Sequence, residues 1–425
     1  MRTVMSWIRR HAFPLVIGLA LAGLFVYFAF LPRRVGLNLW ADFVSGLSQA
    51  TVLVGPIAAG ACAVVASRWT APLSARLATA ARTPSLPIAR HVVGTVLPVA
   101  ASYPLALLCL TVYGAITGTY GAPSPAWLAA IGAATIIACA VGYFAGLFIG
   151  PRWFAAPAAA VGYFALYVLF QSAPWPYGIR TLFPAITNRD TEFARYITAT
   201  TWGQVVLFLS ISLILFLLVR PRAVQRERWL FMAAAPTLLV AIVAAGVIIS
   251  TNGQYITGHN SRDFVCEGTA PVVCVNRGYA ASLEGLLPRF EVLRVKTAGV
   301  ALEPTLLEQN VEGVGDEPSQ DARSIYIEGI DSAGLDQTVS RYVAKYGGFS
   351  TCSPDTPYDT IVATAIVDTW LSGFDQYGLG ELDGSAVGAA EWARMKSTDP
   401  ATGNTWLREH EKSYADCSLV LTDLP

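Results

Sequence analysis

The feature that most constrains this chain is a series of seven long apolar stretches in its first 249 residues. Each is 18 to 25 residues long, and none contains Asp, Glu, Lys or Arg. About 20 apolar residues in a helix cross the hydrocarbon core of a bilayer, and helices satisfy their own backbone groups there. We therefore expect about seven transmembrane helices. The stretches are Phe13–Leu31, Phe43–Ala66, Val92–Ile116, Ala126–Ile149, Trp153–Phe170, Trp202–Val219 and Trp229–Ile249.

The net charge of zero conceals two chemically different parts. The residues before Ser250 include 17 basic and 4 acidic side chains, whereas those from Ser250 onward include 12 basic and 25 acidic ones. Such a division indicates two domains. We expect a transmembrane domain at 1–249 and a water-soluble α+β domain at 250–425, which is long enough to bury its own core.

The arginines predict the orientation of the spans. With the N-terminus in the cytoplasm, twelve arginines of residues 1–249 fall in cytoplasmic segments and five in external loops, as the positive-inside rule requires. Trp40, Trp127, Trp153, Trp202 and Trp229 stand at predicted span ends, as interfacial tryptophans do. Seven crossings then place residues 250–425 outside the cytoplasm, on the cell membrane.

Four cysteines lie in the C-terminal part, and their number is even. Disulfides form in extracytoplasmic compartments, so we expect the pairs Cys266–Cys274 and Cys352–Cys417 among three possible pairings. A four-cysteine zinc site is the alternative, although the chain has no CxxC pair.

Extended and helical patterns alternate in the C-terminal part. Val-, Ile- and Tyr-rich runs predict strands at Phe264–Val275 and Ser324–Ile330. A helix is expected from Thr356, with Thr356 as its cap, Pro357 in its first position and Gly373 at its end. Further helices are expected at 335–346, 384–396 and 402–417.

The fourth apolar stretch carries Gly142, Gly146 and Gly150 at four-residue intervals. Glycines at this spacing let two helix backbones approach closely. They predict either a helix pair at a pore or subunit interface, or ordinary packing within one bundle.

Motifs for catalysis and nucleotide binding are missing from the sequence. It contains no GxxxxGK[ST] phosphate loop, GxSxG elbow or HExxH zinc motif. His91 is expected to be an interfacial residue beside Arg90, and His259 and His410 to be surface residues. We therefore expect no enzyme, cofactor or metal site, and no nucleic-acid partner. A polytopic membrane enzyme is the alternative, with Asp42, Asp190 and Glu192 as its candidates in external loops.

The cytoplasmic segment 67–90 has an amphipathic pattern. Trp69, Leu73 and Leu77 fall on one helical face, and Arg76 and Arg82 lie elsewhere. The pattern fits a helix on the inner leaflet, and it fits equally a docking helix for a cytoplasmic partner.

These features together resemble permease subunits of ABC-2-type transporters, of the peptide-antibiotic export and immunity type. Segment 69–90 matches the position of their coupling helix between spans two and three. Residues 172–201 match their external, partly re-entrant segment, with Phe193, Tyr196 and Ile197 forming a small apolar face. The GYFAGLFIGPRWFAAP run from Gly142 is similar to their tight connection between spans four and five.

The resemblance covers about residues 1–220, and it departs from the family in having a seventh span and an added outer domain. It implies a separate ATP-binding subunit in the cytoplasm, a second membrane subunit, and coupling through Trp69, Leu73, Arg76, Leu77 and Arg82. A membrane-anchored binding or assembly module is the alternative from another class.

Overall fold

The computed structural model divides the chain into two compact units. The membrane unit comprises 1–33 and 38–258, and the outer unit comprises 34–37 and 259–425. The boundary lies beyond residue 249 because strand β2 (Ile256–His259) pairs with β1 (Ala194–Tyr196). The structure describes residues 2–31, 37–68, 85–149, 152–172, 174–183, 194–196, 198–218, 227–252, 256–259, 264–310, 322–327, 329–375 and 387–425.

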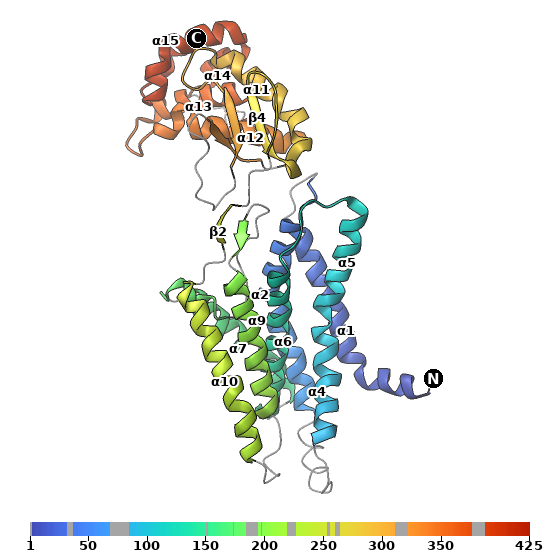
Figure 1. The fold of residues 1–425 in the computed structure, drawn as a ribbon. Helices are drawn as coiled ribbons and strands as arrows, with labels where there is room; N and C mark the ends of the chain where they lie inside the picture. Colours follow the sequence, from blue (N-terminus) through green and yellow to red (C-terminus); the bar gives the residue numbers. More distant parts are fainter. Residues whose placement is uncertain are drawn as a thin grey trace. The chain divides into compact units, whose positions relative to one another are not determined.

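Long helices make up the membrane unit (Figure 1). Six of them are long and apolar enough to cross a membrane, so the chain is a multi-pass membrane protein. The seventh expected span corresponds to α10, whose apolar described part is Ala234–Ser250. The helices are α1 (Arg2–Phe30), α2 (Trp40–Ser67), α4 (Ser85–Ala100), α5 (Ser102–Thr117), α6 (Pro125–Phe148), α7 (Arg152–Ser172), α8 (Tyr177–Arg180), α9 (Thr198–Leu218) and α10 (Glu227–Ser250).

The third expected span consists of two helices, α4 and α5, which meet at Ala101. Pro104 lacks the N–H that would bond the carbonyl of Ala100, and this interrupts the helical hydrogen bonds. The Leu97 carbonyl accepts a bond from Ala101 N at 2.8 Å, so the chain continues in the same direction. Residues 91–117 therefore act as one span of 27 residues.

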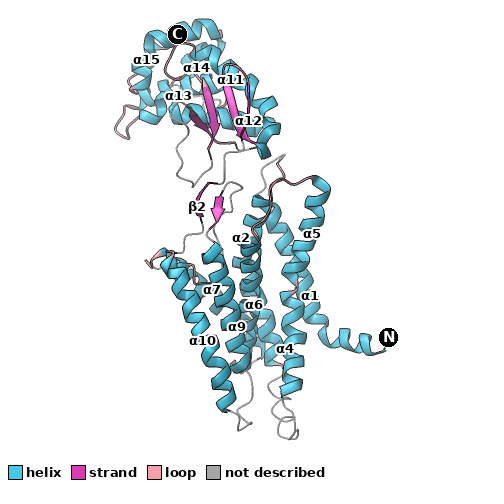
Figure 2. Ribbon diagram, in the orientation of Figure 1, coloured by secondary structure: helices cyan, strands magenta, loops and turns pink. Residues whose placement is uncertain are grey.

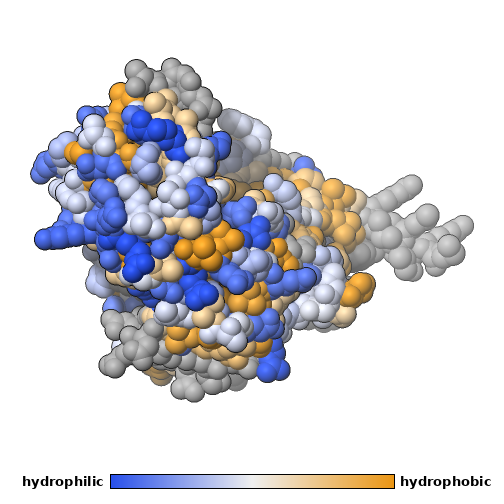
Figure 3. Space-filling model, turned by 90° about the horizontal axis from the view of Figure 1, so that it is seen from above, coloured by the Kyte–Doolittle hydropathy of each residue, from blue (hydrophilic) through white to orange (hydrophobic). Residues whose placement is uncertain are grey.

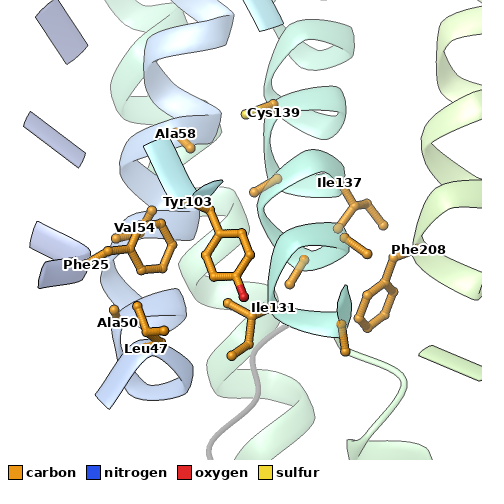
Figure 4. Close-up of a cluster of buried hydrophobic side chains, with 14 of the residues drawn as sticks. Phe25, Leu47, Ala50, Val54, Ala58, Tyr103, Ile131, Ile137, Cys139 and Phe208 are labelled. Atoms are coloured by element: carbon orange, nitrogen blue, oxygen red, sulfur yellow. The ribbon is translucent and has the colours of Figure 1, made fainter. Parts of the chain in front are cut away.

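Helix α2 is the central element of the bundle. It packs against α1, α4, α6 and α7, while α9 packs against α6 and α10. Figure 4 shows large apolar side chains from several helices meeting in the interior, including Phe25, Tyr103 and Phe208. Side chains on the outer faces, such as those of Leu108 and Val161, are 61% and 66% exposed. In a bilayer these faces contact lipid.

The outer unit contains a four-stranded sheet and five α-helices among its described residues (Figure 2). The strand order is β3-β4-β5-β6, with β3 and β4 antiparallel and the other neighbours parallel. The elements are β3 (Phe264–Glu267), β4 (Val272–Asn276), η1 (Arg277–Ser282), α11 (Leu283–Thr297), β5 (Leu306–Gln309), β6 (Arg323–Ile325), α12 (Ser332–Tyr346), η2 (Gly348–Thr351), α13 (Tyr358–Ser372), α14 (Ala389–Ser397), α15 (Pro400–Ala415) and η4 (Leu421–Asp423).

Several details of the outer unit differ from the sequence predictions. The strand expected at Ser324–Ile330 is the shorter β6, which ends at Ile325. The expected strand Phe264–Val275 is a hairpin of β3 and β4, because Gly268 takes a φ of +93° in the connection. The cap of α13 is Pro357 rather than Thr356, whose hydroxyl instead accepts a bond from Ser353 N. Gly373 ends α13 in a left-handed conformation, as predicted.

The surface in Figure 3 is mostly hydrophilic, with hydrophobic residues in small groups. The apolar residues of the outer unit instead gather between its helices and sheet, where Phe290, Val339 and Ile366 are at most 2% exposed. This unit therefore has the core and surface of a water-soluble domain.

Candidate functional site in the helix bundle

The expected coupling residues lie in a part of the chain that the structure does not describe. Residues 69–84 contain all five of them, and Gly150 is also outside the described residues. Their role stays a prediction. The residues are Trp69, Leu73, Arg76, Leu77 and Arg82.

Gly142 and Gly146 lie where α6 meets α2 of the same chain. A Cβ atom at Gly142 would overlap the backbone of Ala59, and one at Gly146 would overlap that of Ala63. The two backbones therefore touch directly, which only glycine permits at these positions. Of the two roles that the spacing allowed, these glycines have the packing role within one bundle.

A polar pair links α4 to α6 inside the membrane unit. His91 Nδ1 lies 2.7 Å from the Tyr143 hydroxyl, and the two residues are 7% and 2% exposed. His91 is the first residue of the third span, where the sequence predicted it, and α4 turns its imidazole into the bundle, where the Tyr143 hydroxyl is a partner. An ionisable side chain inside a membrane bundle is a candidate functional group.

Two thiols lie on the neighbouring α2–α6 contact. Cys62 and Cys139 are both buried, and their thiols are neighbours. Small side chains at this contact allow the close approach that the two glycines also require. Together with His91 and Tyr143, these thiols form a polar patch on three helices.

The N-terminal half of α2 carries a second group of buried polar side chains. Trp127 Nε1 donates a 2.8 Å hydrogen bond to Ser48 Oγ, and both residues are buried. Trp127 lies in the first turn of α6, at the span end where the sequence predicted it, and its indole faces α2. Asp42, expected in an external loop, is 8% exposed in the first turn of α2, where the N-terminal end of a helix stabilises a carboxylate.

Two side chains hold residues 181 and 183, which lie between α7 and α9, against the bundle. Phe183 is 5% exposed, and its ring lies 5.3 Å from that of Tyr163 and 5.6 Å from that of Phe170. Gln204 of α9 donates a 2.8 Å hydrogen bond to the Thr181 carbonyl. Residues 181 and 183 thus pack against the bundle, and the sequence patterns did not identify them. Phe193 and Ile197 are outside the described residues, and only the backbone is described at Tyr196.

Figure 4 shows the apolar layer of the bundle, with Leu47, Val54, Ile131 and Phe208 among its members. Leu47 and Val54 belong to α2, and along this helix they fall between Asp42 near one end and Cys62 near the other. Buried polar side chains also occur within this stretch of α2, at Ser48 and Thr51.

The outer unit contains both expected disulfides. Cys266 and Cys274 are directly paired across β3 and β4, with Cα atoms 4.0 Å apart. Cys352 and Cys417 join residues 65 positions apart, with Cα atoms 5.1 Å apart. Because these four sulfurs are bonded in pairs, they are not zinc ligands. The bonds agree with an extracytoplasmic location.

Lys296 is a partly buried cation of the outer unit. Its Nζ atom donates a 2.5 Å hydrogen bond to the Trp370 carbonyl and lies 4.9 Å from the centre of the Trp370 indole. Burial lowers the pKa of Lys296 to about 8. Because Trp370 is near the end of α13, the ammonium completes the C-terminal hydrogen bonds of this helix. Its role is therefore structural.

Of the two histidines expected at the surface, the structure describes the side chain of His410. The His410 ring stacks on Trp406 at 4.8 Å, and its Nδ1 atom lies 2.9 Å from the Trp406 carbonyl. The side chain of His259 is outside the described residues. Across the described ranges, no group of three or more His, Cys, Asp or Glu residues could hold a metal ion.

Comparison with known proteins adds no relative. No protein-family model matches the chain, and neither the curated proteins nor the solved structures contain a match. The chain is a multi-pass membrane protein with a disulfide-bonded α+β unit.

Proposed function

We propose that the chain is the membrane subunit of an ABC exporter, which moves a peptide or amphiphile with energy from a separate ATPase subunit. The observation that supports this best is the segment between α7 and α9, which Phe183 and Gln204 fasten into the bundle. This is the place of the external, partly re-entrant segment in the permeases that the sequence resembles.

The size of the bundle also supports a transport role. Holding an outer domain at a membrane requires one helix, whereas this chain has six long apolar helices and α10. The interior of the helix bundle is close-packed between α2 and α6. It also contains buried polar side chains on α2, α4, α6 and α9, such as those of Ser48, His91, Thr135 and Gln204. A second membrane subunit would complete the pathway.

Energy has to come from another chain because the sequence contains no phosphate-binding loop. The amphipathic segment 69–82 would receive the motion of the ATPase, with Trp69, Leu73 and Leu77 as the apolar contacts and Arg76 and Arg82 as the charged ones. In this arrangement the outer unit captures, releases or guards the substrate.

Purification of the native complex tests the proposal. We expect a nucleotide-binding subunit to copurify with the full chain, and the double variant Arg76→Glu and Arg82→Glu to retain much less of it. Arg226→Glu, in another cytoplasmic arginine-rich segment, is the matched control and should retain it. Purification without any nucleotide-binding protein, with none encoded nearby, would rule the proposal out. Full function of residues 259–425 expressed alone would favour the anchored binding module instead.

A further inference from the structure

The outer unit contains a compact group of cations and tyrosines that the proposed function does not use. We call Arg323, Tyr326, Tyr342, Lys345 and Tyr346 the tyrosine cluster. Arg323 lies 5.4 Å from the centre of the Tyr346 ring and donates a 2.6 Å hydrogen bond to the Tyr342 hydroxyl. Lys345 lies 5.2 Å from the Tyr346 ring and 5.4 Å from the Tyr326 ring.

One part of this group has a clear structural role. β6 is the terminal strand of the sheet, and the backbone N–H of Ser324 donates a 2.9 Å bond to the Tyr346 hydroxyl. Tyr346 therefore covers an edge that would otherwise pair with other chains. This role accounts for the tyrosine but does not require two cations beside it.

The two cations have only neutral partners among the described residues. Arg323 donates to the Ala301 carbonyl and the Tyr342 hydroxyl, and Lys345 donates to Ser324 Oγ at 2.5 Å. Elsewhere in the unit Arg289 pairs with Asp336 at 2.6 Å. Glu308 is opposite Ser324 in the sheet but makes a contact of its own.

The cluster is open to solvent on one side. Lys345 is exposed, whereas Arg323, Tyr326 and Tyr346 are half-buried. Neighbouring rings hold both cations by cation–π attraction, so an anion that approaches them meets positive charges that are already positioned. Phosphate is a common partner of such groups.

The bilayer is the nearest abundant source of phosphate. α10 ends at Ser250 and β3 begins at Phe264, so 13 residues connect the last helix to the sheet. Even fully extended, this connection spans only about 45 Å. Tyrosine is also a residue that membrane interfaces favour.

We propose that the tyrosine cluster binds the phosphate of an anionic lipid headgroup and thereby orients the outer unit on the membrane. The remainder of this unit is acidic, with 25 acidic against 12 basic residues from Ser250 onward. An anionic membrane surface repels most faces of the outer unit and attracts the face that carries the tyrosine cluster. The inference needs only a membrane beside the outer unit, so it does not depend on the transport proposal.

Lysine acylation measured by mass spectrometry tests this on the full chain in lipid nanodiscs. We expect Lys345 to react more slowly in discs of phosphatidylcholine with one-quarter phosphatidylglycerol than in pure phosphatidylcholine, by on the order of ten-fold for two basic residues. Lys396, which lies against Trp392 in α14, is the internal control and should react equally in both. The Arg323→Gln variant should lose most of the protection of Lys345, and Arg394→Gln should keep it.

Other outcomes would overturn the proposal. Equal protection of Lys345 and Lys396 would indicate non-specific attraction. Protection in pure phosphatidylcholine by added inorganic phosphate, without an effect of phosphatidylglycerol, would indicate a site for a free anion. Protection by an acidic peptide alone would assign the surface to a protein partner. An unchanged rate in all discs would exclude anion binding at Lys345.

Discussion

His91 Nδ1 and the Tyr143 hydroxyl are 2.7 Å apart inside the helix bundle, and this contact joins α4 to α6. The contact gives each side chain a hydrogen-bond partner in an apolar surrounding, where an unsatisfied polar group is costly. The pair therefore fixes the position of α4, the helix that follows the segment expected to contact an ATPase.

Replacing Tyr143 by Phe should destabilise the bundle by about 1–3 kcal/mol, because His91 loses a buried partner. The midpoint of thermal unfolding of the full chain in detergent measures this. Tyr27→Phe is the control, since Tyr27 is 60% exposed on the outer face of α1. Equal midpoints for the two variants would show that the hydrogen bond contributes little.

Gly142→Val should greatly reduce the amount of folded protein, since the new side chain would overlap the Ala59 backbone. Gly162→Val introduces the same side chain on α7, where a Cβ meets no atom within 4 Å. The comparison is the monodisperse fraction in size-exclusion chromatography. If both variants behave alike, the α2–α6 contact is not as close as described.

The two disulfides should differ in their contribution to stability. In the chain-entropy description a cross-link over 65 residues contributes about 4 kcal/mol, and one over 8 residues contributes about 2.5 kcal/mol. Cys352→Ser with Cys417→Ser should therefore lower the melting temperature of the outer unit more than Cys266→Ser with Cys274→Ser. The reverse order would contradict the loop-length argument.

Lys296 should make the outer unit more stable as the pH rises above 8. Its pKa is about 8 in the folded chain, against 10.5 when unperturbed, so unfolding takes up a proton between these values. The full free-energy cost of burying the ammonium therefore applies below pH 8. This cost decreases as the pH rises and is absent above pH 10.5. Relative to Lys296→Met, the wild-type free energy of unfolding should rise by about 3 kcal/mol across this window. A constant difference in denaturant titrations would show that the pKa is not lowered.

Cysteine labelling should place residue 80 in the cytoplasm and residue 298 outside. Ala80→Cys should react only after permeabilisation, whereas Ala298→Cys, at an exposed position after α11, should react in intact cells. The opposite pattern would invert the orientation that the arginines predict and would place the disulfides in the cytoplasm.

Much of the architecture could be predicted because it depends on local patterns. Hydrophobic length determines which segments enter a membrane, and this located α2, α6 and α9 without reference to other elements. The even count of cysteines and the short loop between Cys266 and Cys274 predicted the first disulfide, and Cys352–Cys417 was the pair that remained. The charge division at Ser250 separated the two units, and the boundary moved only because β2 pairs with the distant β1.

Contacts between distant residues were decided by the tertiary structure. The sequence placed Trp127 at a span end but could not show that its indole bonds to Ser48 of another helix. Likewise, the sequence marked Gly142 for close packing, but only the fold identified Ala59 as its neighbour. The sequence by itself therefore determined what lies in the membrane, since transfer to lipid depends on composition. Which polar groups meet inside the bundle, as His91 and Tyr143 do, depends on how the helices pack in three dimensions.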